Sequence, residues 1–160
     1  MKLYSVFDTA RTMPFRTVSL ILSTPSREVF NFLANIENLP CWAVRTCESL
    51  RILRGRWYAL TCRGQEVVHL EADDQSRAID VLAGPVPNQM TPLSIRVTPL
   101  SLTRTLVRMT CIRPPEQSAE RYEQEYQWHL EELAELGRRF GDGELFAYTA
   151  GTLSTGQGLN

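Results

Sequence analysis

The chain has 160 residues, a net charge of −1 and 43% hydrophobic residues, which is the size and composition of one globular domain with its own core. This charge excludes the strongly basic surface of most nucleic-acid-binding proteins, and no apolar run approaches the roughly 18 residues that span a bilayer. Asp8, Arg11 and Pro14 interrupt any signal-peptide core near the N-terminus, so we expect a cytoplasmic protein.

Four cysteines and two histidines are the residues that could hold a transition metal. They are Cys41, Cys47, Cys62, Cys111, His69 and His129. None of the cysteines forms a CxxC pair, and two histidines are too few to complete a zinc set of the usual spacing. We therefore expect free thiols without a disulfide scaffold, and neither a metal site nor a cofactor.

The chain begins with an expected arm over residues 1–14 and a first strand over residues 15–23, where apolar and polar residues alternate. A helix is expected to start at Thr24 and Pro25, because threonine caps helices and proline is tolerated at the first helical position. A short second helix or turn then carries Trp42.

The middle of the chain predicts a series of short antiparallel strands. Turn residues recur about every 8–12 positions, which is typical of an antiparallel meander. The expected strands are residues 44–53, 56–62, 65–72, 77–83, 93–98 and 102–112. Several of them have one apolar and one polar face, so another element must cover the apolar face of the sheet.

The last expected element is an amphipathic helix from Ser118 to Arg139, the only element long enough to cover that face. Ser118 can cap its first turn, and Tyr122 and Tyr126 belong to its apolar stripe. Residues 141–160 are rich in glycine, threonine and serine, and we expect them to form a tail that is mobile or draped over the surface.

The flanks and back of this helix are acidic. The glutamates expected there are Glu123, Glu125, Glu131, Glu132 and Glu135. Trp128 lies about 160° from the apolar stripe, in the middle of this acidic surface, and a tryptophan in that position needs cover. Either the tail covers it, through Leu145, Phe146 or Tyr148, or a second subunit does. A homodimer contact at Trp128 is the alternative that we favour.

The order of elements, β-α-α-β(about six)-α, resembles the START-like, helix-grip superfamily, which includes polyketide cyclase/dehydrase-like proteins of the SRPBCC type. The segment STPSREVFNFLANIENLPCWA (residues 23–43) and the closing helix from Ser118 carry the resemblance, which covers about residues 15–140. It implies an α+β domain in which a curved antiparallel sheet of about seven strands wraps around the C-terminal helix and encloses an apolar cavity. Members of the superfamily bind lipids, sterols, polyketides or other hydrophobic molecules. A minority catalyse cyclisation, dehydration or hydrolysis, without a universal catalytic motif.

Six residues are the candidate lining of that cavity. They are Trp42, Tyr58, Met109, Tyr122, Tyr126 and His129. The polar groups of the last three could project into an apolar cavity as handles for a ligand, or could be satisfied within the core. Trp42 and Met109 could equally be core anchors. Tyr58 follows Trp57 in a strand, so only one of the two can enter the cavity.

The second histidine, His69, lies in the sequence VVHLE and admits two readings. If Val68 and Leu70 face inward, His69 and Glu71 lie on the solvent side of the sheet. Otherwise His69 and Glu71 would form an acid/base pair inside the cavity. We favour the solvent side, because burial of both groups is costly unless they pair.

Three functional hypotheses follow. The first is a non-enzymatic carrier that holds a hydrophobic small molecule, such as a lipid or polyketide, between the sheet and the long helix. The second is a cyclase/dehydratase-like enzyme that uses the same cavity, with His129 or His69 and a tyrosine as acid and base. The third is a protein-interaction module in which Trp128 and the tail matter more than any cavity.

Overall fold

The computed structural model describes residues 13–141 and 143–153 and shows an α+β fold. The helices after the first strand are α1 (Ser26–Leu33), the 3-10 helix η1 (Ile36–Asn38) and α2 (Leu39–Trp42), and the long helix is α3 (Ala119–Arg139). The strands are β1 (Met13–Leu22), β2 (Ser49–Leu53), β3 (Arg56–Thr61), β4 (Gly64–Asp73), β5 (Ala78–Gly84), β6 (Thr91–Pro99), β7 (Thr105–Ile112) and β8 (Gly143–Leu153).

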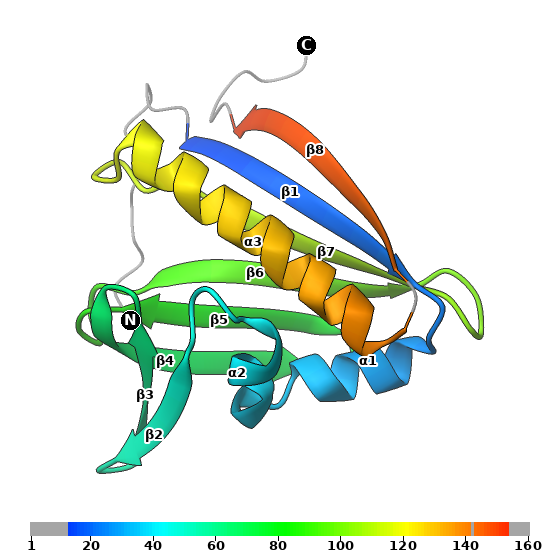
Figure 1. Cartoon of the computed structure of the whole chain (residues 1–160), viewed down its shortest axis with the longest axis horizontal. Helices are drawn as coiled ribbons and strands as arrows, with labels where there is room; N and C mark the ends of the chain where they lie inside the picture. Colours follow the sequence, from blue (N-terminus) through cyan, green and yellow to red (C-terminus); the bar gives the residue numbers. More distant parts are fainter. Residues whose placement is uncertain (1–12, 142, 154–160) are drawn as a thin grey trace.

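All eight strands form one antiparallel sheet with the order β2-β3-β4-β5-β6-β7-β1-β8. Figure 1 shows α3 lying across this curled sheet, with α1 near the C-terminal end of α3. The edge-to-face contact between the rings of Phe32 and Phe140, with centroids 5.5 Å apart, joins these two helices. The predicted α+β, helix-grip architecture is confirmed, with eight strands in place of about seven.

The inner face of the sheet forms the core with α1 and α3. Along β7, Val107, Met109 and Cys111 are buried while Arg108 is exposed, which is the two-residue period expected of a strand with one dry face. Each fully buried aliphatic side chain of this kind contributes roughly 1.5–3 kcal/mol to folding. The alternation therefore explains why a long helix must cover this face.

The predicted start of α3 is capped as expected, whereas the predicted start of α1 is not. Ser118 caps α3 as expected, since its Oγ accepts a hydrogen bond from Arg121 N at 3.1 Å. Thr24 does not cap α1, because Pro25 occupies the N-cap position without a side-chain bond. The Thr24 carbonyl instead accepts a hydrogen bond from Thr105 Oγ1 at 2.6 Å and ties the start of α1 to β7.

Residues 143–153 form the edge strand β8, so the expectation of a tail is wrong for this segment. Strand β8 pairs with β1 from Leu22↔Gly143 to Met13↔Leu153. A Cβ at Gly143 would lie 2.9 Å from Leu20 Cδ1 and 3.1 Å from Gly137 Cα, so two glycines let the chain return close to the end of α3. The glycine content that suggested a tail serves this close approach. The arm before residue 13 and the residues after 153 lie outside the described residues.

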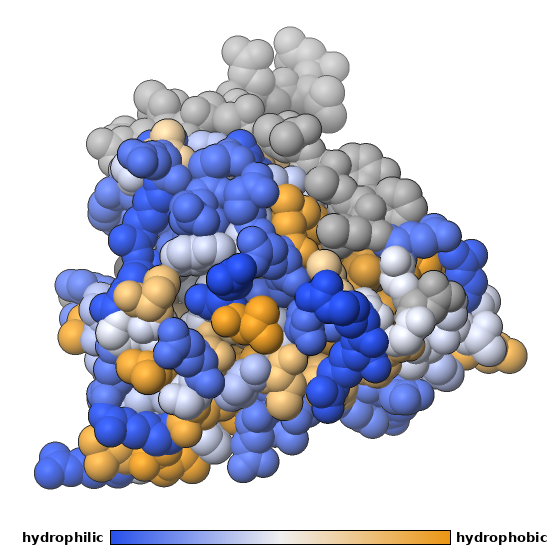
Figure 2. All heavy atoms as spheres, viewed as in Figure 1, coloured by the Kyte–Doolittle hydropathy of each residue, from blue (hydrophilic) through white to orange (hydrophobic). Residues whose placement is uncertain are grey.

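The outer surface is mostly polar on the side that α3 presents. Figure 2 shows hydrophilic residues over much of this face and apolar residues gathered near the β2–β3 hairpin, where Ile52, Leu53 and Leu60 are exposed. Among the described residues, no helix combines the length and apolar character that crossing a membrane requires.

Candidate ligand-binding cavity

A cavity of about 190 Å³ lies between α3 and the inner face of the sheet. Strands β3 to β7 form one wall, the N-terminal half of α3 forms the other, and α2 closes one side. Its buried apolar lining includes Leu39, Trp42, Ala59, Val68 and Val81. This part of the cavity is therefore an apolar chamber built by alternate residues of neighbouring strands.

The cavity opens at the end where three connections meet. Its exposed lining residues are Arg63 in the β3–β4 turn, Pro85 and Gln89 in the β5–β6 loop, and Thr91 and Pro92 at the start of β6. The connection between β7 and α3 adds Pro114 and Gln117, which are partly buried. The mouth is thus lined by loops, whereas the chamber is lined by strands and helices.

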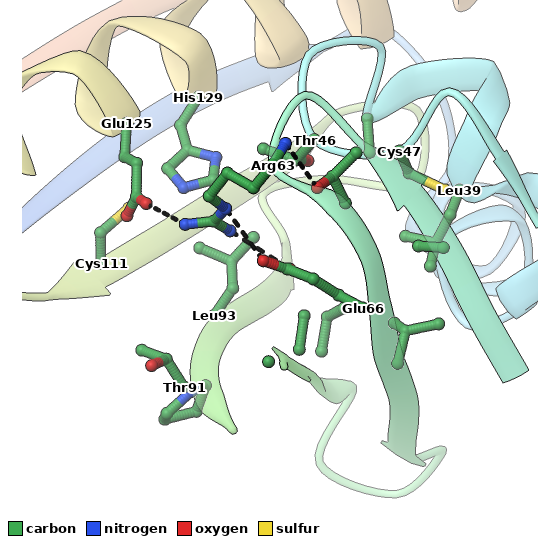
Figure 3. A pocket seen from close by; sticks show the side chains of 18 of the residues that line it. Leu39, Thr46, Cys47, Arg63, Glu66, Thr91, Leu93, Cys111, Glu125 and His129 are labelled. Atoms are coloured by element: carbon green, nitrogen blue, oxygen red, sulfur yellow. Dashed lines mark hydrogen bonds and ion pairs between the residues drawn. The ribbon is translucent and has the colours of Figure 1, made fainter. Parts of the chain in front are cut away.

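A charged cluster bridges the mouth from the sheet to the helix (Figure 3). The guanidinium of Arg63 lies between two carboxylates, with Nη1 2.7 Å from Glu125 Oε1 and Nε 2.9 Å from Glu66 Oε1. Gln117 Nε2 donates to the other Glu125 oxygen at 2.8 Å. Since Glu125 belongs to α3 and Glu66 to β4, this cluster ties the two walls of the cavity together at its mouth.

A buried histidine–carboxylate pair lies on one face of α3, and its histidine, His129, lines the chamber. His129 Nδ1 lies 2.9 Å from Oε2 of the fully buried Glu132. Glu132 Oε1 accepts hydrogen bonds from Arg45 N at 3.1 Å, Thr46 N at 2.9 Å and Thr46 Oγ1 at 2.7 Å. The expectation that Glu132 belongs to the acidic flanks and back of the helix is wrong, since Glu132 is fully buried. Its partners from the loop after α2 compensate the cost of that burial.

The environment of His129 favours its charged form. Burial lowers its pKa, but hydrogen bonding and electrostatic interaction with Cys111 and Glu132 outweigh burial and raise the pKa of His129 to about 10. Burial and the charge of Glu132 raise the pKa of Cys47 to about 11. The same carboxylate therefore favours an imidazolium on one side and a protonated thiol on the other.

Tyr122 and Cys111 complete the polar part of the chamber. The Tyr122 hydroxyl donates to the Cys111 carbonyl at 2.8 Å, which joins α3 to the end of β7. Burial and the charge of Cys111 raise the pKa of Tyr122 to about 12, although the Arg16 guanidinium, 5.5 Å from its ring centroid, acts in the opposite direction. The Cys111 side chain lines the cavity beside His129.

No protein-family model and no curated protein sequence matches this chain. Several solved structures do resemble it. The Zhui aromatase/cyclase of Streptomyces sp. R1128 is 14% identical, with a TM-score of 0.59 over 79% of this chain and 93% of that chain. A START superfamily protein of Mycobacterium smegmatis is 14% identical, with a TM-score of 0.55 over 81% of this chain and 97% of that chain. Norcoclaurine synthase of Thalictrum flavum is 10% identical, with a TM-score of 0.58 over 87% and 95%.

This protein has the START-like, helix-grip fold. The predicted resemblance is thereby confirmed for the fold. It does not extend to activity, because proteins that share a fold at such low sequence identity can have unrelated activities.

The START-like cavity contains three of the six residues predicted to line it. Trp42, Tyr122 and His129 are on its wall. Met109 is fully buried in the core, and Tyr126 is buried beneath the Arg16 guanidinium, 4.4 Å from its ring centroid. Neither lies on the cavity wall, because strands and helix pack directly against each other at that level.

Neither Trp57 nor Tyr58 lines the cavity, although Trp57 is on the inner face of the sheet. Trp57 packs against the core, whereas Tyr58 is half-buried beside Leu60 and Gln65 at a separate outer groove. The alternation along β3, in which Ala59 is buried and Leu60 exposed, fixes this orientation. Tyr58 is therefore not part of the START-like cavity.

The solvent-side interpretation of His69 is confirmed. His69 Nε2 lies 3.4 Å from Glu71 Oε1, and their side chains are 57% and 66% exposed. The alternative of a cavity acid/base pair at His69 is wrong, because Val68 faces the cavity and its neighbour must face away.

Trp128 is half-buried on α3 rather than fully exposed. The side chains of Leu145, Phe146 and Tyr148, which were expected as possible cover for it, lie outside the described residues. The homodimer contact at Trp128 stays a prediction.

Sequence reasoning missed Arg63, Glu66, Glu125 and Cys111 as cavity groups, and it missed Glu132 as the buried partner of His129. One signal was available for Glu132, since its spacing of three residues from His129 places both side chains on the same face of a helix. Arg63 and Glu66 meet Glu125 only through the tertiary fold, and no local pattern announces that contact.

Proposed function

We propose that this START-like domain binds an apolar small molecule that carries a few polar groups. The observation that carries the proposal is an apolar chamber, open at one end, with charged and polar side chains at its mouth. Apolar atoms of a ligand would lie in the chamber, and its polar atoms would meet Arg63, Glu66 and Glu125 at the mouth.

The volume bounds the ligand. Ligand pockets usually enclose about 300–1,000 Å³, and this cavity encloses about 190 Å³. A molecule of one or two rings, or a short chain, fits such a chamber. A longer molecule would extend through the mouth and displace the Arg63 side chain from Glu125. Affinity would come mainly from apolar surface buried in the chamber, at roughly 25 cal/mol per Å².

The test is ligand binding by matched variants of one strand. Ala83 lines the cavity, whereas Ala78 on the same strand lies outside it. Ala83→Phe should fill the chamber and abolish binding of a two-ring fluorophore such as 2-naphthol, and Ala78→Phe should leave binding unchanged. Native mass spectrometry of the freshly purified protein would identify any molecule that copurifies. Equal fluorophore binding by both variants would contradict the proposal.

A cyclase- or dehydratase-like enzyme in the same cavity is the second candidate. The His129–Glu132 pair favours it, because a histidine oriented by a carboxylate is a common proton donor and acceptor in catalysis. An aromatase/cyclase and a synthase also occur among the similar structures. Turnover of a polyketide-like or carbonyl substrate that is lost in His129→Gln, with ligand binding retained, would distinguish this enzyme from a carrier.

A further inference from the structure

The β2–β3 hairpin combines exposed arginines with exposed apolar side chains. Between residues 49 and 65 the chain has four arginines and no acidic residue, although the net charge of the whole chain is −1. Three of these arginines, Arg51, Arg54 and Arg56, are exposed in or beside the turn. None of the three forms an ion pair within the described part of the chain. The closed end of the hairpin therefore carries a positive charge that these residues leave without a counter-ion.

The same end exposes apolar groups on both faces of the hairpin. Ile52 pairs with Trp57 and points to one face, whereas Leu53 pairs with Arg56 and points to the other. The side chains of Ile52 and Leu53 are 58% and 50% exposed. Figure 1 shows this end of the hairpin, at the lower left, pointing away from α1 and α3. One flat surface cannot cover both side chains, whereas a fluid medium can surround them.

The turn holds these side chains in place. Arg54 and Gly55 have φ angles of 52° and 76°, the signs of a two-residue turn of type I′. Such a turn matches the twist of its two strands and leaves no loose loop between them. The arginines and the apolar side chains of residues 51–57 are thus presented together on a short, ordered wedge.

We propose that the closed end of the β2–β3 hairpin binds the surface of an anionic lipid bilayer. Ile52 and Leu53 enter the boundary between headgroups and acyl chains, and the guanidinium groups stay at the level of the lipid phosphates. Trp57, which is half-buried beside Ile52, lies where tryptophan is enriched at membrane–water interfaces. The inference goes beyond the proposed function and does not require an occupied cavity.

Charge complementarity selects anionic lipids as the partner. A guanidinium group donates several hydrogen bonds to phosphate oxygens in a planar geometry. The negative surface potential of an anionic leaflet adds an attraction for each arginine that comes near it. Neutral lipids offer the apolar contacts without this second term, so the hairpin should discriminate between the two kinds of surface.

A second copy of the chain fits the hairpin poorly. Strand β2 is at the edge of the sheet, but an antiparallel pairing of two copies centred on β2 would place the two Arg51 side chains opposite each other. Like charges directly opposite destabilise a strand pair, and charged side chains commonly protect an edge from such pairing. A stable protein interface also needs about 20–30 residues on each side, which is more than residues 51–57 supply.

The test is cosedimentation of the full chain with sucrose-loaded vesicles. One set is made of phosphatidylcholine alone, and the other of equal parts of phosphatidylcholine and phosphatidylglycerol. The unaltered protein should bind the anionic vesicles at least about 10-fold more tightly than the neutral ones. Added sodium chloride should reduce this preference, because salt screens exposed charges. Equal binding to both sets, or binding to neither, would overturn the inference, and this comparison needs no variant.

Two double variants separate the charged from the apolar contribution. Arg54→Asn with Arg56→Gln should weaken binding to anionic vesicles about 25-fold, which is about 5-fold for each charge. Asparagine is used at position 54 because it tolerates a positive φ. Ile52→Ser with Leu53→Ser should weaken binding at least about 10-fold, because less apolar surface enters the bilayer. Unchanged binding in both double variants would overturn the inference.

The chain offers a matched control for each kind of change. Leu102 is 92% exposed in the β6–β7 connection, and Arg108 is exposed on β7. Leu102→Ser and Arg108→Gln should bind anionic vesicles as the unaltered protein does. Losses in these controls as large as those in the hairpin variants would contradict a site at the hairpin, because any exposed leucine or arginine would then suffice.

Two further measurements on the same samples distinguish the inference from its alternatives. Light scattering without vesicles tests a second copy as the occupant, and a dimer that becomes monomeric in the Ile52→Ser, Leu53→Ser variant would overturn the membrane assignment. Binding of 2-naphthol should persist in the hairpin variants, because the cavity mouth at Arg63 lies at the other end of β3. Vesicle binding by a protein that takes up no 2-naphthol would support the hairpin site and refute the proposed function alone.

Discussion

The buried pair of His129 and Glu132 makes a specific prediction about stability and pH. The pKa of His129 is about 10 in the folded protein and about 6.5 in the unfolded chain. As the pH rises above 6.5, the unfolded chain loses this proton while the folded protein keeps it. The stabilisation is therefore fully present below pH 6.5 and is lost as the pH rises through 10.

The magnitude follows from the same linkage. A single proton of this kind changes the free energy of unfolding by at most about 1.4 kcal/mol per pH unit, so the loss between pH 6.5 and pH 9 amounts to about 3 kcal/mol at most. The raised pKa values of Cys47 and Tyr122 act in the same direction, but only above their ordinary values of 9.0 and 10.0. The lowered pKa values of Asp73 and Glu123 act below 4.5. Between pH 6.5 and pH 9 the dependence of stability on pH therefore comes from His129, which loses its proton in the unfolded chain and keeps it in the folded protein.

The assay is urea unfolding at closely spaced pH values, followed by tryptophan fluorescence. The unaltered protein should lose stability steadily across this window, and His129→Gln should show a nearly flat profile. His69→Gln is the matched control, because His69 is 57% exposed on the outer face of the sheet, and its profile should keep the slope of the unaltered protein. A flat profile in the unaltered protein would refute the reasoning, since it would mean that His129 is not held as an imidazolium.

Three further predictions follow from the placement of single residues. Arg63→Gln should speed both entry and exit of ligand in stopped-flow fluorescence, because it removes the ion pair that bridges the mouth. It should change stability by less than about 1 kcal/mol, because this pair is partly exposed. Unchanged rates would mean that this pair does not restrict the mouth. Met109→Ala should cost about 2–5 kcal/mol of stability and leave ligand affinity unchanged, since Met109 is fully buried away from the cavity. Trp128→Ala should lower the molar mass measured by light scattering from dimer to monomer, and a monomeric unaltered protein would exclude this contact.

The fold was predictable because its main signals are local. The stripe through Tyr122, Tyr126 and Leu133 on α3 and the alternation along β7 both survive in the structure. Strand β8 was missed because its partner is β1, at the other end of the sequence, and because Gly143 reads as a loop residue when the packing against Gly137 is unknown. Element type depends on neighbours in sequence, whereas an edge strand depends on a neighbour in space.

The candidate site was predictable only in part, and the reason is again distance along the chain. Trp42 and His129 could be placed near a cavity by helical position alone. The polar groups in and beside the cavity depend on contacts across the fold, such as Arg63 with Glu125 and Thr46 with Glu132. A strand residue such as Tyr58 can be assigned to a face only when its register is known.

Glu132 links the stability of the fold to the chemistry of the cavity. A fully buried carboxylate is costly unless it is well bonded, and this one receives bonds from the Thr46 hydroxyl, two backbone N–H groups and His129. Glu132→Gln can keep the first three with its amide oxygen, but its NH₂ group would face His129 and favour a neutral ring that accepts a hydrogen bond at Nδ1. This variant should therefore flatten the dependence of stability on pH between pH 6.5 and pH 9. A profile as steep as that of the unaltered protein would show that Glu132 does not hold His129 in its charged form.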